Sequence, residues 1–344
     1  MPSRPRAAET PRPPRAAARV AGLHYVNDEA AGLTRKGAPG HFHYVGPSGK
    51  RVRDKAMLRR IDRLAIPPAW QDVWISTDAR AHLQATGRDA RGRKQYRYHP
   101  AFAAIRDTDK YRHLLQFARV LPALHRRLRQ DMRRKGLPRE KILACAVTLL
   151  EESLIRVGNE TYARENHSFG LTTLQNRHVH IHGGLLRFLF TGKSGKKWDL
   201  AVRDRRVARV LRACQELPGQ HLFEYRDDAG AVHPITSGDV NDYLREISGA
   251  DITAKDFRTW AGTVQAATAF AAVKGPATGK AVRDVVGQVA ARLGNTVAVC
   301  RKCYIHPAVI DAFEQGNLRL SGRGPGRAEK DVLRLLRMKR SVAA

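Results

Sequence analysis

The spacing of apolar residues along the chain changes near residue 100. Between residues 22 and 104, apolar and polar positions alternate in short runs, which is typical of half-buried strands. Strands are predicted at about 41–45, 50–53, 72–76, 83–86 and 94–98, and the first two form a hairpin around the turn 46–49. A helix is predicted over 55–64, because apolar residues there have helical spacing and Pro67 and Pro68 follow. We expect this region to fold as a small N-terminal antiparallel β-sheet domain.

Beyond residue 104 the apolar positions follow the period of a helix. Helices are predicted at about 107–119, 121–135, 139–156, 203–214, 237–248, 255–273, 278–293, 307–315 and 327–338. Residues 178–202 interrupt this pattern with alternating apolar positions and a polar turn at 191–195, which predicts a small β-hairpin sheet. The 344 residues also exceed a usual single domain of roughly 100–200 residues. The expected fold is therefore α+β, with a mainly α domain over 105–344 after the sheet domain over 22–104.

Residues 1–21 form a separate region composed largely of Arg, Pro and Ala. Its prolines predict a flexible basic arm without a regular helix. The arm is either a dispensable solvated tail or an auxiliary phosphate-binding segment.

The charge of the chain narrows the choice of partners. Lys and Arg number 62 against 32 Asp and Glu, which gives a formal net charge of +30. Such a charge destabilises a folded chain by self-repulsion unless a polyanion neutralises it, and nucleic acid is the largest polyanion in a cell. The hydrophobic content of 42% is high enough for folded cores and excludes a wholly disordered basic protein. These values predict a globular protein that binds a polyanion.

The sequence also indicates a compartment. No stretch approaches the roughly 20 apolar residues of a membrane span, and no apolar signal-peptide core follows the basic N-terminus. The four cysteines are compatible with a reducing compartment. We expect a cytoplasmic, nucleoid-associated protein without contact to a membrane.

Two short patterns resemble parts of metal sites. Cys300 and Cys303 look like half of a zinc site with His306 as a third ligand, but no second cysteine pair completes it, so ordinary helical thiols are favoured. Three histidines would share one strand face, namely His178, His180 and His182. Solvated or phosphate-facing histidines are favoured there, because one strand rarely completes a tetrahedral site. We expect no metal and no cofactor.

A third pattern, Gly192-Lys193-Ser194, resembles the end of a phosphate-binding loop. A Walker A motif needs a glycine five positions before Gly192, and that residue is Arg187, so ATP binding is not expected. Lys193 instead lies at the tip of the predicted hairpin. It is either an ordinary surface lysine or a side chain that reaches into a groove and donates a proton.

Three further residues lie on predicted helices or at their ends: Arg156, Arg258 and Tyr304. Each alone could be an ordinary surface residue. Together with Lys193 they supply a nucleophile, an acid and a bidentate clamp for an anionic phosphorane, which suffices for phosphoryl transfer without metal.

Basic and aromatic residues interleave over 88–99. Alternation along this strand places Tyr96 and Tyr98 on one face and Gln95 and Arg97 on the other. Gln95 can pair with adenine, and the tyrosines can contact the DNA backbone or thymine methyl groups. The alternative is a half-buried strand with solvated cations.

With these residues assembled, the chain resembles a poxvirus-type DNA topoisomerase IB of the bacterial branch, from about Leu23 to just beyond Tyr304. The order and separation of the matching segments are highly specific. They are Ile66-Pro-Pro-Ala-Trp70, Gly92-Arg-Lys-Gln-Tyr-Arg-Tyr98, Ile155-Arg-Val-Gly-Asn-Glu160, Gly192-Lys193, Lys255-Asp-Phe-Arg-Thr-Trp-Ala-Gly-Thr263 and the spacing from Asn295 to Tyr304.

The resemblance implies that the two domains form a clamp around double-stranded DNA and act as a single chain. It implies that Tyr304 is the nucleophile, Arg156 and Arg258 the phosphate clamp, and Lys193 the general acid. Asn295 stands where histidine is usual, and its amide can donate a hydrogen bond to a phosphate oxygen but cannot carry a proton charge. Residues at the positions of DNA contacts in the family are Gln95, Tyr96, Tyr98, Tyr162 and Lys255.

The resemblance further implies relaxation of supercoiled DNA through a 3′-phosphotyrosyl intermediate and religation, without ATP or an obligatory metal. Two alternatives remain at this point. A tyrosine recombinase uses the same chemistry but usually has a His-x-x-Arg clamp, whereas this chain has Lys255-Asp-Phe-Arg258. A non-enzymatic basic nucleoid-binding protein would bind DNA without cleaving it.

Overall fold

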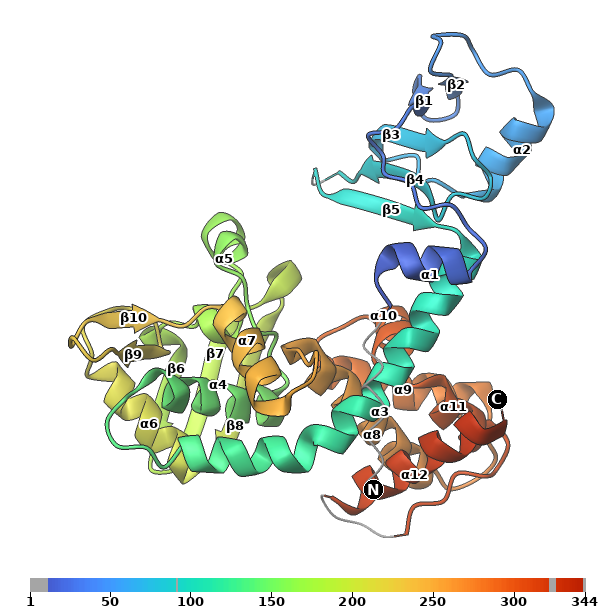
Figure 1. The fold of residues 1–344 in the computed structure, drawn as a ribbon. Coiled ribbons are helices and arrows are strands. Elements are labelled where there is room, and N and C mark those ends of the chain that lie inside the picture. Colours follow the sequence, from blue (N-terminus) through green and yellow to red (C-terminus); the bar gives the residue numbers. More distant parts are fainter. Residues whose placement is uncertain (1–11, 91, 322–325, 343–344) are drawn as a thin grey trace, which may run out of the picture. The chain divides into compact units, whose positions relative to one another are not determined.

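The computed structural model of the chain describes residues 12–90, 92–321 and 326–342. Its contacts divide the chain into two compact units, Glu9–His113 and Leu114–Ala344. The division falls inside helix α3 (Pro100–Asp131), so the boundary expected between residues 104 and 105 also lies within this helix. Figure 1 shows the elements of both units.

The N-terminal unit contains a five-stranded antiparallel sheet with the strand order β2-β1-β3-β4-β5. Its strands are β1 (Gly32–Lys36), β2 (His43–Val45), β3 (Gln71–Ser76), β4 (Leu83–Arg88) and β5 (Lys94–Tyr98). Helix α2 (Lys55–Arg63) begins after Asp54, whose side chain accepts a hydrogen bond from the Ala56 amide at 2.9 Å. Ile61 of this helix packs on the sheet residues Val73 and Ile75, which forms a core on one face.

Two predictions for this unit are wrong in detail. The segment 50–53 is not a strand, because only a single bridge joins Arg51 to Val45 after the predicted turn. Strand β2 pairs instead with β1, a short charged segment without clear alternation that the sequence pattern did not reveal. The predicted strands at 72–76, 83–86 and 94–98 are confirmed to within two residues.

The prediction that the basic arm contains no helix is also wrong for its described part. Helix α1 (Pro14–Val20) has Pro14 in its first turn, where a proline costs no hydrogen bond. Ala17 and Ala18 are buried against Leu23 and Phe102, and this contact holds the helix in place. Residues 1–11 of the predicted arm lie outside the described residues.

The helices predicted at 107–119 and 121–135 are one continuous helix, α3, which has Pro122 in its interior. The last residue of α3, Asp131, is fully buried and binds Arg127, Arg134 and the Tyr243 hydroxyl. Burial opposes ionisation of Asp131, but these hydrogen bonds keep its pKa below the usual value. The end of α3 is thereby fixed to the larger unit.

The larger unit is mainly helical. Its remaining long helices are α4 (Arg139–Ser153), α6 (Arg205–Gln215), α7 (Ser237–Ser248), α8 (Ala254–Ala271), α9 (Gly279–Leu293), α11 (Pro307–Glu314) and α12 (Arg327–Val342). These helices confirm the predicted ones to within a few residues at each end. Two shorter helices, α5 (Glu160–Asn166) and α10 (Val297–Cys303), were not predicted.

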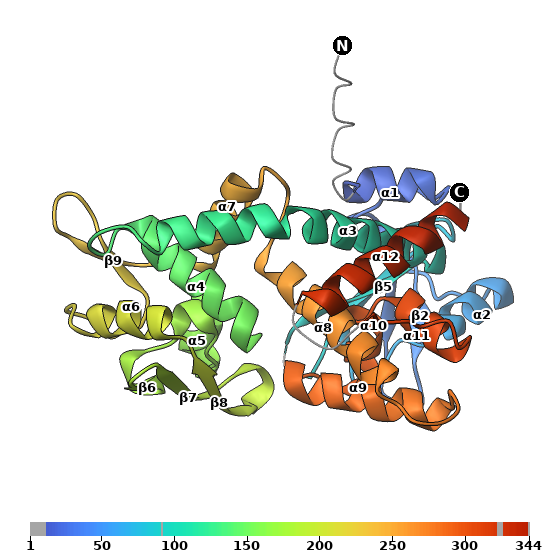
Figure 2. The ribbon, with the colours of Figure 1, turned by 90° about the horizontal axis from the view of Figure 1, so that it is seen from below.

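Small sheets interrupt these helices. Strands β6 (Val179–His182), β7 (Leu185–Thr191) and β8 (Lys197–Arg203) form an antiparallel sheet, which confirms the predicted hairpin and adds a third strand. The pair β9 (Glu224–Arg226) and β10 (Val232–Pro234) was missed. Helices α4 and α6 pack against the three-stranded sheet (Figure 2). The α+β class is confirmed, and the described helices include none that is long and apolar enough to cross a membrane.

Candidate active site

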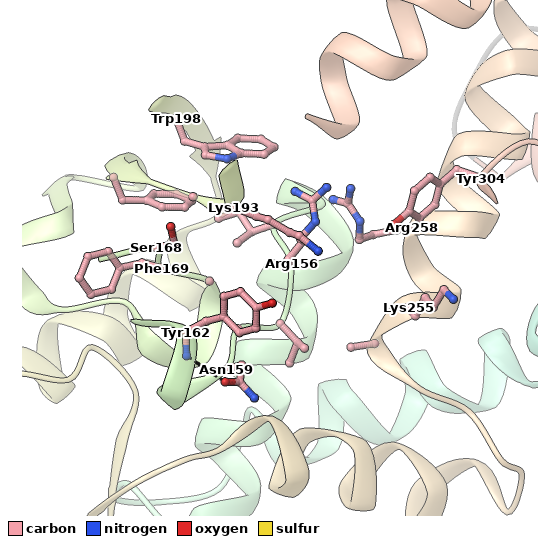
Figure 3. A pocket seen from close by; sticks show the side chains of 17 residues that line it. Arg156, Asn159, Tyr162, Ser168, Phe169, Lys193, Trp198, Lys255, Arg258 and Tyr304 are labelled. Atoms are coloured by element: carbon pink, nitrogen blue, oxygen red, sulfur yellow. Dashed lines mark hydrogen bonds between the residues drawn. The ribbon is translucent and has the colours of Figure 1, made fainter. Parts of the chain in front are cut away.

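A hollow of about 330 Å³ in the larger unit brings together most of the residues selected from the sequence. Its lining comes from the chain after α4, from α5, from the loop 168–170, from β7 and β8 with the turn between them, from the start of α8 and from the end of α10. Figure 3 shows Arg156, Lys193, Arg258 and Tyr304 around this hollow.

Arg156 is positioned by an extended segment that follows α4. The helix ends at Leu154, which adopts a left-handed conformation with φ 56°. The amides of Leu171 and Thr172 then bind the carbonyl oxygens of Arg156 and Val157, both at 2.8 Å. The backbone of this segment at Gly158 also packs directly against the backbone at Gly170. A Cβ atom at Gly170 would lie only 2.5 Å from the Cα atom of Gly158. These contacts fix the backbone from which the Arg156 side chain enters the hollow.

Arg258 lies in the first two turns of α8, one of the best-anchored helices in the unit. Thr253 and Asp256 form a capping box, in which the Asp256 carboxylate accepts from the Thr253 amide at 2.8 Å. The Arg258 side chain is only 3% exposed. Its guanidinium donates to the carbonyl oxygens of Leu154 and, at 2.6 Å, Leu293.

The charge of Arg258 has no carboxylate partner among the described residues. Burial lowers the pKa of this guanidinium, and the nearby charge of Arg156 lowers it further. A buried charge without a counter-ion is costly, and the half-buried guanidinium of Arg156 repels that of Arg258. An anion that enters between them removes both penalties, so the pair is suited to hold a phosphate.

Tyr304 caps the C-terminal end of α10, where its amide donates to Cys300 at 2.9 Å. Helix α8 passes so close that a Cβ atom at Gly262 would lie 2.6 Å from the Tyr304 carbonyl oxygen. The Thr263 hydroxyl lies 3.3 Å from the same oxygen. The Arg258 guanidinium carbon is 5.2 Å from the centre of the Tyr304 ring. The phenol and the guanidinium are therefore held next to each other by the α8–α10 contact.

Asn295 follows Gly294, the left-handed residue that ends α9. Its carbonyl oxygen Oδ1 accepts a hydrogen bond from Arg156, which also contacts the Gly294 carbonyl at 3.4 Å. The amide nitrogen Nδ2 of Asn295 is buried and has no hydrogen-bond partner among the residues that the structure describes. The side chain thus orients Arg156 with one atom and keeps a free donor on the other, although Asn295 does not itself line the hollow.

Lys193 lies in the turn between β7 and β8, as the sequence predicts. The Gly192 amide closes this turn on the Lys196 carbonyl at 2.8 Å, and Ser194 adopts a left-handed φ of 65°. Gly192 itself packs against the Trp198 indole, where a Cβ atom would lie 2.6 Å from Nε1. The Lys193 side chain is exposed, and it lines the hollow from the side of the sheet.

Two of the predicted DNA contacts, Tyr162 and Lys255, also line the hollow. Tyr162 is exposed on α5, which begins after Asn159, whose side chain accepts from the Tyr162 amide at 3.0 Å. Lys255 is exposed in the first turn of α8. Both are placed to touch a ligand that extends beyond the hollow.

The other three predicted contacts lie on β5, the edge strand of the N-terminal unit. Tyr96 and Tyr98 are exposed on one face and stack with ring centres 5.9 Å apart, which confirms the predicted alternation. Gln95 lies on the opposite face, and its amide donates to the Asp89 carboxylate at 2.9 Å. This local bond occupies one of the groups by which Gln95 was expected to read a base.

Sequence reasoning missed several residues that line the hollow, notably Asn159, Ser168, Phe169 and Trp198. Asn159 had a visible signal, because an Asn before a helix with Glu in its first turn is a common start of a helix. Ser168 and Phe169 gave none, since only the fold brings their loop to the chain after α4.

The expectation that three histidines share a strand face is wrong. His178 precedes β6 in a short 3₁₀ turn, where its ring is buried against Phe169 and accepts from the Gln175 amide at 3.0 Å. Only His180 and His182 lie on the strand. Cys300 is buried in α10, and burial raises the pKa of its thiol to about 11. The described residues contain no group of three or more His, Cys, Asp or Glu side chains arranged to hold a metal.

Comparisons with known proteins agree with this geometry. Residues 99–321 match the family "Eukaryotic DNA topoisomerase I, catalytic core", and residues 41–89 match "Bacterial DNA topoisomerase IB, N-terminal domain". The chain is 29% identical over 284 residues to DNA topoisomerase 1B of Acanthamoeba polyphaga mimivirus, which covers 79% of this chain and 84% of the viral protein. It is 21% identical over 276 residues to DNA topoisomerase 1B of vaccinia virus (strain Copenhagen). This match covers 77% of this chain and 84% of the vaccinia protein. Because the catalytic-core family matches more than half of the chain, the chain belongs to the type IB DNA topoisomerases.

Proposed function

We propose that the protein relaxes supercoiled duplex DNA by cutting one strand, holding it through a 3′-phosphotyrosyl bond and resealing it, without ATP or an obligatory metal. The observation that carries this proposal is the buried, carboxylate-free guanidinium of Arg258 beside Arg156 and the Tyr304 ring. A nucleophile next to a pair of guanidiniums that can hold an anion fits attack on a phosphodiester.

In the first step the Tyr304 hydroxyl oxygen attacks a backbone phosphorus. A bond forms between this oxygen and phosphorus, the bond from phosphorus to the 5′-oxygen breaks, and the phenolic proton passes to water. Arg156 and Arg258 hold the negative charge that builds up on the non-bridging oxygens, and the free Nδ2 of Asn295 donates to one of them. By analogy with arginine fingers, each guanidinium contributes on the order of 10³–10⁵ to the rate.

Lys193 acts as the general acid. Its position on a turn at the edge of the hollow lets the ammonium reach the leaving oxygen while the phosphate rests on the guanidiniums. Proton donation by a positioned side chain contributes roughly 10²–10⁴ in rate. Resealing is the reverse reaction, in which the 5′-hydroxyl attacks the phosphotyrosine. One ester replaces another of similar energy, so torsion in the DNA drives relaxation.

The remaining residues extend the DNA contact. Tyr162 and Lys255 touch the strand next to the hollow, and Gln95, Tyr96 and Tyr98 on β5 contact the duplex. We further propose that the two units form a clamp around DNA and that the protein acts as a monomer. Its proposed location is the cytoplasm, with the nucleoid.

The decisive experiment is plasmid relaxation in EDTA without ATP, followed by denaturation to trap protein joined to DNA. We expect the wild-type chain to relax the plasmid and to leave a 3′-linked adduct, and Tyr304→Phe to lose both while it keeps DNA binding. Retention of full activity by Tyr304→Phe would remove the proposed nucleophile. Binding without any adduct would favour the nucleoid-binding alternative, and strand exchange between two plasmids would favour a recombinase.

A further inference from the structure

A second hollow, of about 600 Å³, lies at the opposite end of α4 from the candidate active site. The end of α3, the connection to α4, the first turn of α4 and the exposed side of α6 line it. Helix α4 has 15 residues, which corresponds to a length of about 22 Å at 1.5 Å per residue. Arg156 follows the far end of that helix, and the two hollows share no lining residue.

The charge of this second hollow is uniformly positive. Half of its ten lining residues are cationic, and none is acidic: Arg129, Arg133, Lys141, Arg206 and Arg209. Lys141 is fixed by donating to the carbonyl oxygens of Arg134 and Gly136, both at 2.8 Å, which leaves it one further N–H. Arg206 is neutralised by Asp204 at 2.9 Å.

The other three cations are different. Arg129, Arg133 and Arg209 make no ion pair with any residue in the described part of the chain. Three exposed guanidiniums that line one concavity repel one another, and an anion with several adjacent charges relieves this repulsion. A polyphosphate chain is such an anion.

The rest of the lining is mostly apolar. It contains Met132, Leu137, Val210 and Ala213, of which Val210 is buried, and we call these four residues the apolar floor. A duplex backbone needs only surface charge, whereas an apolar floor beneath a charged rim is typical of sites for small ligands with a flat ring. We propose that this hollow binds a nucleoside polyphosphate, with the base on the apolar floor and the phosphates on Arg129, Arg133 and Arg209.

The test is calorimetric titration of the full chain with ATP at physiological ionic strength. We expect saturable binding of one ATP per chain, and Arg129→Gln and Arg209→Gln should each weaken it by about tenfold or more, because each removes charge-assisted hydrogen bonds. Arg126→Gln is the matched control, since Arg126 is exposed on the same helix but does not line the hollow. It should change affinity by less than about twofold, as expected for a screened surface charge. Thermal unfolding of each variant verifies that it is folded.

Two further titrations locate the ligand and identify it. Arg156→Gln should leave ATP affinity unchanged, because that residue belongs to the other hollow; a loss there would place ATP in the active site and overturn the proposal. Inorganic triphosphate should bind about tenfold more weakly than ATP, since it lacks the ring. Equal affinity would show that the floor contributes nothing to binding. If a short DNA duplex displaced ATP, and this displacement depended on Arg129 and Arg209, the hollow would be a second duplex site. Absence of saturable ATP binding would refute the proposed nucleotide site.

Discussion

The candidate active-site hollow and the exposed face of the N-terminal sheet both present cationic and aromatic side chains, but they hold them in opposite ways. In the hollow, Arg258 is 3% exposed and donates to the carbonyl oxygens of Leu154 and Leu293, with the Tyr304 side chain next to it. On the sheet, Tyr96 is 47% exposed, and its neighbour Lys94 is already paired with Asp28 at 2.6 Å. In the hollow, the charge of Arg258 has no carboxylate partner among the described residues, whereas on the sheet the charge of Lys94 is paired with a carboxylate at the surface.

This difference separates two roles. Burial of a guanidinium without a carboxylate costs folding free energy, so such a residue is expected where an anion must be held in a defined position. Exposed and locally paired side chains cost little, and they contribute modest, screened interactions with DNA. We therefore expect substitutions in the hollow to change the rate of cleavage, and those on the sheet to change affinity.

The largest effect is expected for Arg258→Ala. Loss of a clamp guanidinium should slow single-turnover cleavage by about 10³–10⁵, because the charge on the phosphorane is then held by Arg156 alone. Filter binding should show a much smaller change in DNA affinity. Arg258→Lys should remain slow as well, since an ammonium cannot donate to two carbonyl oxygens and a phosphate with the same geometry. A loss of less than about tenfold would remove Arg258 from the clamp.

Lys193→Ala should have the next largest effect. Cleavage is expected to slow by about 10²–10⁴ with little change in binding, because only the proton donor is lost. A substrate with sulfur at the 5′-bridging position needs no protonation on leaving, so it should recover much of the lost rate. The neighbouring Lys196 is a suitable control, since it lies in the same turn but does not line the hollow. An unrescued Lys193→Ala defect would exclude proton donation as its role.

The residues proposed to be catalytic were the part of the site most accessible to sequence analysis. Arg156, Lys193, Arg258 and Tyr304 have side chains whose chemistry limits their roles, and the structure brings all four to one hollow. The strand alternation at 94–98 and most helices were also predictable, because their apolar periods are long enough to identify.

What the sequence could not show depends on contacts between distant segments. The bond from Arg156 to Asn295 joins residues 139 positions apart, and the anchoring of Arg258 on Leu293 joins residues 35 positions apart. Strand β1 lacks a clear apolar alternation, α10 has only seven residues, and α1 forms because Ala17 and Ala18 are buried against Phe102. Tertiary packing decides such segments, so local propensity did not predict them.

A smaller effect should follow from Gly262→Ala, which tests whether the hollow depends on the close approach of α8 to Tyr304. The added Cβ would lie 2.6 Å from a backbone oxygen, so the nucleophile or the helix must shift. We expect a loss of about 1–3 kcal/mol in the free energy of unfolding and cleavage slowed by up to about 10²-fold. Urea denaturation and single-turnover assays measure the two effects.

Gly287→Ala is the control for that substitution. Gly287 lies inside helix α9 with no atom within 4 Å of an added Cβ. Alanine there should stabilise the protein by about 0.5–1 kcal/mol and leave cleavage unchanged. Equal behaviour of the two variants would mean that the α8–α10 contact does not position Tyr304.

The smallest effect is expected on the sheet, from Tyr96→Ala. The ring is exposed, stacks on Tyr98 and has the Lys94 ammonium 5.9 Å from its centre, so its removal should weaken DNA binding by a few-fold, about 0.5–1.5 kcal/mol, without slowing cleavage by bound enzyme. Because no charge is removed, the dependence of affinity on salt should keep its slope, whereas Lys255→Ala should lower that slope by about one. Tyr96→Phe keeps the stacked ring but removes the hydroxyl, so it distinguishes the contribution of the hydroxyl from that of the ring. If Tyr96→Ala instead slowed cleavage at saturating DNA as strongly as Lys193→Ala, the sheet would take part in assembling the active site, and the division between a catalytic hollow and an affinity surface would fail.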